Sequence, residues 1–293
     1  MIFQDLSNGI ALGATYALIA IGYTLVYGIL RLINFAHSNI FTLGAYIAFV
    51  FVAMIGIHWA FAYAFAILLT AIVGRMTERI AYKPLRDAPR ISVLISAIAV
   101  SYIIENILVM IFGGRPKSFP RPEIFDQVVT VGTVRIPSVN IIIILTAAVV
   151  LTVLIIVLYR TKQGRAMRAM AMDFDTSRLM GVNVNKTIGF TFVIGSGLAA
   201  IAGILVANKY PQVNPYMATM YGLKAFVAAV FGGIGSVPGA AIGGVLLGLL
   251  EILFVALLPD LSGYRDAIAF VILIVVLLYK PTGLMGVKGR VKV

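Results

Sequence analysis

The sequence predicts an all-α fold, a polytopic transmembrane helix bundle of about eight to nine spans. Of the 293 residues, 61% are apolar and only 12% are charged, and the apolar residues form long runs separated by short basic loops. Soluble domains are about 45–50% apolar and about 25% charged. No change in composition marks a second domain. We therefore expect residues 1–293 to form a single transmembrane domain.

The apolar runs have the length that a membrane-spanning helix requires. They cover about residues 6–30, 36–55, 60–80, 92–112, 140–159, 187–208, 222–237, 239–258 and 266–279. This pattern predicts nine crossings. The glycine-rich interruption at 232–239 leaves eight or ten crossings, or a re-entrant hairpin over 222–258, open. Small residues four positions apart, as in Gly244 and Gly248, predict close packing between helices.

The basic residues predict the orientation. If the loop at 160–186 is cytoplasmic, 16 of the 23 Lys and Arg residues lie inside, 6 lie outside, and Lys224 lies within a span. This asymmetry follows the positive-inside rule. The N-terminus then lies on the outer side of the membrane and the C-terminus in the cytoplasm. The net charge of +12 reflects topology, so we expect lipid contact and no nucleic-acid partner. In the outer loop 113–139, the stretch 128–136 predicts a short β-hairpin.

The sequence lacks motifs that would indicate thiolate chemistry, nucleotide binding or metal binding. There is no cysteine, so thiolate nucleophiles and thiolate metal sites are excluded. No GxxxxGK[ST] loop is present to hold nucleotide phosphates. The two histidines, His37 and His58, do not form an HExxH motif. We therefore expect no catalytic residues, no metal site and no cofactor bound by this chain.

The loop at 160–186 is the main polar insert between apolar runs. It contains six basic residues: Arg160, Lys162, Arg165, Arg168, Arg178 and Lys186. At 100° per residue, one face of a helix in this loop is apolar, and its members are Met167, Met170, Ala171 and Phe174. Gly181 is suited to end this helix and Asn185 to begin the next. Such a face suits a groove on a partner protein. The alternative is a solvated basic loop that only sets topology.

Three charged residues fall within the predicted spans: Glu105, Lys224 and Glu251. Charges inside a membrane usually face the bundle interior and are paired. We hypothesise that Lys224 pairs with Glu251; snorkelling to an interface and direct handling of substrate or protons are the alternatives. Near the end of the first span, Asn34 and His37 are candidates for lining a pathway, or for capping and hydrogen bonding within the bundle.

Several segments together resemble the LivH-type permease of bacterial branched-chain amino acid ABC importers, over nearly the whole chain. They are Gly13-Ala-Thr-Tyr-Ala-Leu-Ile-Ala-Ile-Gly-Tyr23, Ile33-Asn-Phe-Ala-His37, Leu43-Gly-Ala-Tyr46, Gly164-Arg-Ala-Met-Arg-Ala169, Leu179-Met-Gly-Val182, Lys224-Ala-Phe226, Gly232-Gly-Ile-Gly-Ser236, Pro238-Gly-Ala240 and Pro281-Thr-Gly283. The resemblance implies an importer of leucine, isoleucine or valine. It also implies two ATP-binding cassette subunits that carry ATP and Mg²⁺, a second related permease chain in a heterodimer, and a periplasmic substrate-binding protein.

The resemblance also implies that the 160–186 loop docks on an ATPase subunit, whose nucleotide cycle would alternate the opening of the pathway. In such permeases the docking signature resembles EAA-x-x-x-G, and Asp175-Thr-Ser177 followed by Gly181 is similar to it. The expected docking residues are Arg165, Met167, Arg168, Met170, Ala171, Phe174, Asp175 and Gly181.

Other functions remain open at this point. A permease for urea or short amides would be similar in sequence. A proton-coupled secondary transporter or a channel would also explain the interrupted segments at 31–38 and 232–239, with Glu105 and Glu251 relaying protons. Of these alternatives, the sequence gives the least support to a membrane enzyme.

Overall fold

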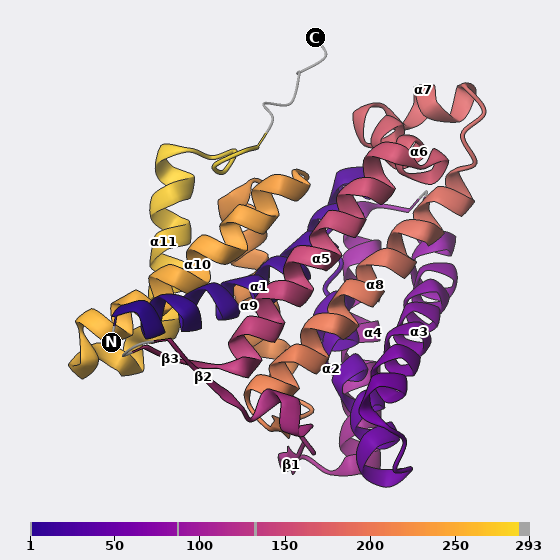
Figure 1. Cartoon of the computed structure of the whole chain (residues 1–293). Helices are drawn as coiled ribbons and strands as arrows, with labels where there is room; N and C mark the ends of the chain where they lie inside the picture. Colours follow the sequence, from indigo (N-terminus) through magenta and orange to yellow (C-terminus); the bar gives the residue numbers. More distant parts are fainter. Residues whose placement is uncertain (1, 87, 132–133, 287–293) are drawn as a thin grey trace.

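The computed structural model describes residues 2–86, 88–131 and 134–286. Within these ranges the chain forms eleven α-helices (Figure 1): α1 (Ile2–Leu30), α2 (Ala36–Phe49), α3 (Trp59–Thr77), α4 (Arg90–Phe112), α5 (Ser138–Arg160), α6 (Lys162–Met172), α7 (Phe174–Leu179), α8 (Val184–Lys209), α9 (Met217–Gly232), α10 (Val237–Leu257) and α11 (Arg265–Tyr279). Short π-helical or 3-10 stretches extend or join them: η1 (Val50–Met54), η2 (Glu78–Tyr82), η3 (Lys83–Leu85), η4 (Glu123–Phe125) and η5 (Pro259–Tyr264).

Eight helical segments among the described residues are long and apolar enough to cross a membrane: Phe3–Leu30, Ala36–Met54, Trp59–Leu85, Arg90–Phe112, Ser138–Arg160, Val184–Lys209, Val237–Leu257 and Pro259–Tyr279. The shorter apolar helix α9 makes the ninth element of the bundle. The predicted polytopic helix bundle is thereby confirmed. The interrupted stretch at 222–258 forms two helices, α9 and α10, that pack on each other. They are joined through Gly233 and Gly235, whose φ angles of 110° and 96° favour glycine.

The helices α1 and α8 form the centre of the bundle, while α4, α5 and α11 lie at its edges. The most extensive helix contact joins α1 to α10. There the backbone of Gly13 lies against Gly244 and Val245, and Gly248 lies against Gly13, so that an added Cβ would clash with backbone. The predicted small-residue stripe on α10 therefore serves packing, since small residues let helix backbones approach closely.

The two ends of the bundle differ. One end holds α6 and α7, together with the end of α5 and the start of α8 (Figure 1). The opposite end holds the strands. The strands β2 (Val128–Val131) and β3 (Val134–Pro137) pair antiparallel, with Val129 opposite Ile136, which confirms the short hairpin predicted there. A second pairing joins β1 (Lys117–Ser118) to β4 (Gln212–Val213).

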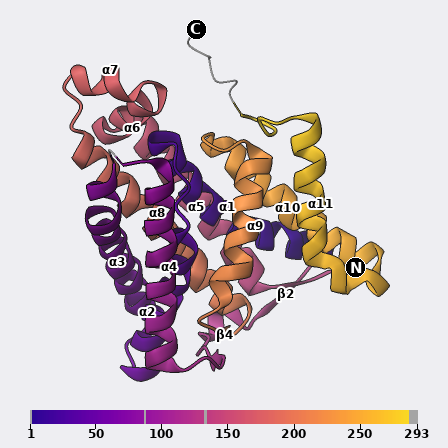
Figure 2. The same cartoon turned by 180° about the vertical axis from the view of Figure 1, so that it is seen from behind.

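The first and last helices run between these ends. The helix α1 begins near the strands, and α11 ends at the other side of the bundle, as both views show (Figure 2). After α11 the chain returns to the corner between α9 and α10. There Leu284 N–H donates to Phe231 O at 2.9 Å, and Met285 N–H donates to Gly232 O at 2.8 Å. The basic residues Lys288, Arg290 and Lys292, which enter the orientation argument, lie outside the described residues.

Candidate functional site

The polar insert forms two short helices, which we call the α6–α7 segment (residues 160–186). The Thr161 hydroxyl begins α6 by accepting a hydrogen bond from Gly164 N–H at 3.0 Å. Asp173 then interrupts the helix, and its carboxylate accepts from Thr176 N–H at 3.0 Å to begin α7. The single amphipathic helix expected from the sequence is therefore divided, because a residue with a strong capping side chain stands in its middle.

The turn after α7 follows the prediction in one respect and differs in another. Gly181 has a φ of 83° and ends the turn, as expected. The next helix, α8, is capped by Asn183, whose side chain accepts from Lys186 N–H at 3.0 Å. The sequence analysis assigned this role to Asn185, which was wrong by two residues.

The apolar face of α6 points into the protein itself. The side chains of Met167 and Met170 are each only 2% exposed, and Ala171 and Phe174 pack half-buried against the same core. The neighbours of α6 are the adjoining helices of this chain, α1, α5 and α8. The expectation that this face meets a partner protein is therefore wrong for Met167 and Met170, because the bundle already covers them.

A different set of residues faces outward from the α6–α7 segment. The predicted docking residues Arg165, Arg168, Asp175 and Gly181 are exposed. Three apolar side chains that were not among the predicted docking residues are also largely exposed: Met172 at 89%, Leu179 at 87% and Met180 at 80%. Leu179 and Met180 directly precede Gly181 in a stretch too short to show a helical period.

On the other side of the bundle, charged residues from three helices form a charged cluster of Lys224, Glu251, Arg265 and Asp266. The Lys224 Nζ atom on α9 lies 2.5 Å from Glu251 Oε1 on α10 and 2.5 Å from Asp266 Oδ1 on α11. Arg265 pairs through Nε with the same Glu251 carboxylate. Tyr16 of α1 donates its hydroxyl to Glu251 Oε2 at 3.0 Å. The hypothesised Lys224–Glu251 pair is thus present, within a larger network.

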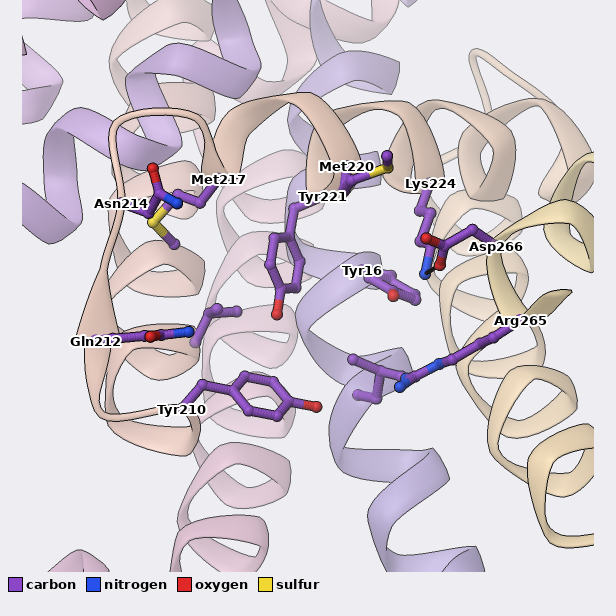
Figure 3. A pocket seen from close by; sticks show the side chains of 12 residues that line it. Tyr16, Tyr210, Gln212, Asn214, Met217, Met220, Tyr221, Lys224, Arg265 and Asp266 are labelled. Atoms are coloured by element: carbon purple, nitrogen blue, oxygen red, sulfur yellow. Dashed lines mark ion pairs between the residues drawn. The ribbon is translucent and has the colours of Figure 1, made fainter. Parts of the chain in front are cut away.

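Three members of the charged cluster, Lys224, Arg265 and Asp266, line one wall of a pocket of about 360 Å³, which we call the α1–α9–α11 pocket (Figure 3). It lies between α1, α9, α11 and the loop that follows α8. Its lining residues are Leu12, Tyr16, Val206, Tyr210, Gln212, Asn214, Met217, Met220, Tyr221, Lys224, Arg265 and Asp266. In Figure 3, Tyr16, Tyr210, Tyr221 and Arg265 converge on the same space. Two cations and the Asp266 carboxylate here face both hydroxyl groups and apolar surface, while Glu251 is not among the lining residues.

The other predicted polar residues lie elsewhere in the bundle. Asn34, in the corner between α1 and α2, accepts a hydrogen bond from the Tyr82 hydroxyl at 2.5 Å. His37 is buried, with its ring edge-on to Tyr23 at a centroid distance of 4.9 Å. Glu105 is half-buried and lines a separate pocket between α2, α4 and α9. Of the five, Lys224 and Glu251 therefore meet through their side chains, and Asn34 and His37 meet through the backbone, where His37 N–H donates to Asn34 O at 3.1 Å.

The bundle and its sites match a known group of transport proteins. The family described as branched-chain amino acid transport system, permease component, matches this sequence over residues 6–277. The chain belongs to this permease family. The match spans all eight membrane-length segments apart from the first residues of α1 and the last of α11. The permease is a multi-pass membrane protein and the permease component of a transport system.

Individual relatives agree with the family. The permease is 41% identical over 296 residues to the high-affinity branched-chain amino acid transport system permease protein LivH of Escherichia coli (strain K12), covering 97% of this chain and 95% of that protein. It is 42% identical over 297 residues to BraD of Pseudomonas aeruginosa, a permease protein of the same description, with the same coverage. The ribose import permease protein RbsC of Escherichia coli (strain K12) is more distant, at 27% identity over 85% of this chain and 77% of that protein.

A solved structure shares the fold of the permease. A chain from the structure described as PsaBC from Streptococcus pneumoniae in complex with Fab superposes with a TM-score of 0.50. The alignment covers 99% of the permease and 93% of that chain, at 12% sequence identity. This likeness supports the arrangement of helices and carries no information on the solute.

Proposed function

We propose that this permease is the membrane-spanning subunit of an ATP-driven importer of leucine, isoleucine and valine in a bacterial cytoplasmic membrane. The observation that carries the proposal is the 41% identity, over 97% of the chain, to a permease of a high-affinity branched-chain amino acid transport system. An identity of this extent over every span supports a common solute class, whereas the ribose permease matches at 27%.

The proposal includes partner subunits, because the chain carries no phosphate-binding loop. Two ATP-binding cassette subunits would bind ATP and Mg²⁺, a second related permease chain would complete the membrane unit, and a periplasmic protein would deliver the amino acid. Residues 1–293 would act as one transmembrane domain, with a periplasmic N-terminus, a cytoplasmic C-terminus and a cytoplasmic docking loop at 160–186. The basic residues gathered on the α6–α7 segment support this orientation.

The outward surface of the α6–α7 segment is the proposed contact with an ATPase subunit. Met172, Leu179 and Met180 are almost fully exposed in a segment that stands beyond the end of the bundle. Exposed apolar side chains surrounded by charged residues are typical of a protein interface. The arginines Arg165 and Arg168 would border this contact. Docking would thus use the face opposite to the buried methionines Met167 and Met170.

Contacts between the α6–α7 segment and the membrane helices would carry movement from one to the other. The Arg31 guanidinium, at the end of α1, donates to Ala171 O on α6 at 3.2 Å. At the start of α8, the Asn185 side-chain oxygen accepts from Arg86 at 2.6 Å. Arg86 in turn pairs with the buried Glu78 at the end of α3. A displacement of the segment on ATP binding would therefore tilt the spans and alternate the opening of the pathway.

The test is transport by the reconstituted complex. The permease would be purified with its ATPase, second permease and binding-protein partners and placed in liposomes. We expect uptake of labelled leucine that requires ATP at the ATPase side and stops when the partner ATPase is inactivated. Uptake of urea in place of leucine would refute the proposed solute. Leucine uptake driven by a proton gradient without ATP would refute the proposed mechanism.

A further inference from the structure

We propose that the α1–α9–α11 pocket transiently binds the amino acid zwitterion as it passes through the permease. Arg265 would hold the carboxylate, Asp266 would hold the ammonium group, and the apolar wall would hold the aliphatic side chain. This inference rests on the proposed function and adds to it a place and a set of contacts.

The charge balance of the pocket suits a ligand with both charges. The charged cluster contains two cations, Lys224 and Arg265, and two anions, Glu251 and Asp266. Placing an unpaired charge in such surroundings is costly, whereas a zwitterion has no net charge and offers a partner for each sign. A lone carboxylate or a lone amine would instead bring an unbalanced charge into a cluster whose own charges sum to zero. The pocket therefore favours an amino acid over a simple acid or amine.

The four charges divide into an inner and an outer pair. The side chains of Lys224 and Glu251 are 8% and 1% exposed, while those of Arg265 and Asp266 are 31% and 50% exposed. Arg265 contacts Glu251 through Nε, and Asp266 contacts Lys224 through Oδ1. The terminal guanidinium nitrogens of Arg265 and the second oxygen of Asp266 are separate from these pairs. The buried residues Lys224 and Glu251 thus hold Arg265 and Asp266 in place, and each of these two keeps further polar atoms with which it can bind a ligand.

The pocket has the size and the apolar surface that a branched side chain needs. Its volume of about 360 Å³ lies in the range of about 300–1,000 Å³ that is common for small-molecule sites. The apolar lining comes from Leu12, Val206, Met217 and Met220. Methionine side chains adapt their shape to a ligand, so this wall accommodates leucine, isoleucine or valine alike.

The backbone adds to the binding of the carboxylate. The helix α9 begins at the pocket, with Met217 as its first residue. The N-terminal end of a helix carries a partial positive charge and attracts anions. In transporters such helix ends within the membrane often face the anionic group of a substrate. The start of α9 thus adds a partial positive charge to the pocket, in addition to the guanidinium of Arg265.

The test measures binding and selectivity in the assembled complex without the binding protein. Labelled leucine would be competed with leucinol, which lacks the carboxylate, and with 4-methylpentanoate, which lacks the amine. Because a hydrogen bond to a charged group is involved, we expect leucine to outcompete each analogue by about tenfold or more. Arg265→Gln should abolish the preference over leucinol, and Asp266→Asn the preference over 4-methylpentanoate. In a separate uptake measurement on the complete complex, binding protein included, both should raise the apparent KM for leucine by about tenfold.

Matched controls and a second kind of variant keep the test decisive. Arg135→Gln and Asp260→Asn remove the same charges from exposed positions outside the pocket and should leave uptake and selectivity unchanged. Met220→Trp fills the pocket without removing a charge and should reduce leucine uptake even if a charge variant fails to assemble. Unaltered KM and selectivity in Arg265→Gln, Asp266→Asn and Met220→Trp would overturn the site while the proposed function stands. Absence of ATP-dependent leucine uptake in the unaltered complex with its binding protein would overturn both.

Discussion

The permease arranges polar and apolar residues in opposite ways at its two candidate sites. In the α6–α7 segment the apolar side chains Met167 and Met170 face inward and the charges face outward, as in a water-soluble protein. In the charged cluster the charges of Lys224 and Glu251 face inward, with apolar helix surface around them. The difference shows that burial alone does not identify function here. The deciding property is whether each buried side chain makes its contacts, apolar or ionic, with other residues of the same chain.

Removing the central carboxylate of the charged cluster should have the largest effect. Glu251→Ala leaves Lys224 and Arg265 without their shared partner. Breaking a buried ion pair costs about 3–5 kcal/mol, so we expect unfolding in mixed detergent micelles at much milder conditions. Glu123→Ala, at an exposed position, is the matched control and should have little effect. A stability of Glu251→Ala equal to that of the control would show that the network does not stabilise the fold.

The second-largest effect on stability is expected from a charge placed on the inward face of the α6–α7 segment. Met170→Asp places a carboxylate where the side chain is 2% exposed. Loss of the methionine packing and burial of an unpaired charge should together lower the free energy of unfolding by at least about 2 kcal/mol. The same unfolding measurement on the permease without partners checks this. An unchanged stability would mean that this face is open, as the sequence alone suggested.

A smaller effect is expected from Tyr16→Phe. This change removes the 3.0 Å hydrogen bond to Glu251 and leaves the ion pair with Lys224 in place. Hydrogen bonds to charged groups contribute about 1.5–3 kcal/mol, so the loss of stability should be smaller than that of Glu251→Ala. Combining both changes should cost less than their sum, because Tyr16 and Lys224 share one carboxylate. Full additivity of the two losses would argue against a coupled network.

The smallest effect on stability is expected on the outward face of the α6–α7 segment. Leu179→Asp changes a side chain that is 87% exposed, so the free energy of unfolding should shift by no more than about 0.5 kcal/mol. Recovery of the ATPase subunit with the permease should nevertheless fall about tenfold or more, since a residue central to an interface contributes above 1 kcal/mol. Normal ATPase recovery with Leu179→Asp would refute the outward docking surface.

The sequence predicted most of the bundle because hydrophobic length and charge asymmetry are local signals. The runs at 36–55 and 140–159 correspond closely to α2 with η1 and to α5. The hairpin at 128–136 was predicted from its strand-forming residues. The pairing of β1 with β4 was not, since two short segments distant in sequence carry no local pattern.

The candidate sites were predicted in part. Periodicity identified the apolar face of α6 correctly, yet it does not say whether that face packs on this chain or on another. The sequence suggested Lys224 with Glu251, which lie on adjoining helices. It did not indicate Tyr16, Arg265 or Asp266, because their contact with Glu251 or Lys224 depends on how α1 and α11 pack. Tertiary packing, rather than local chemistry, completes the network.

One helix joins the two regions. The helix α1 places Tyr16 beside the charged cluster and ends next to Arg31, which holds the α6 backbone. The fourteen residues between them, 17–30, span about 21 Å at 1.5 Å per residue, in a helix whose surface is buried almost throughout. A helix packed on nearly all sides has little freedom to bend. A displacement at one end would therefore move the other end by sliding or rotation of the whole helix. The position of the Tyr16 hydroxyl would then depend on the nucleotide state of the proposed ATPase partner, across much of the membrane thickness.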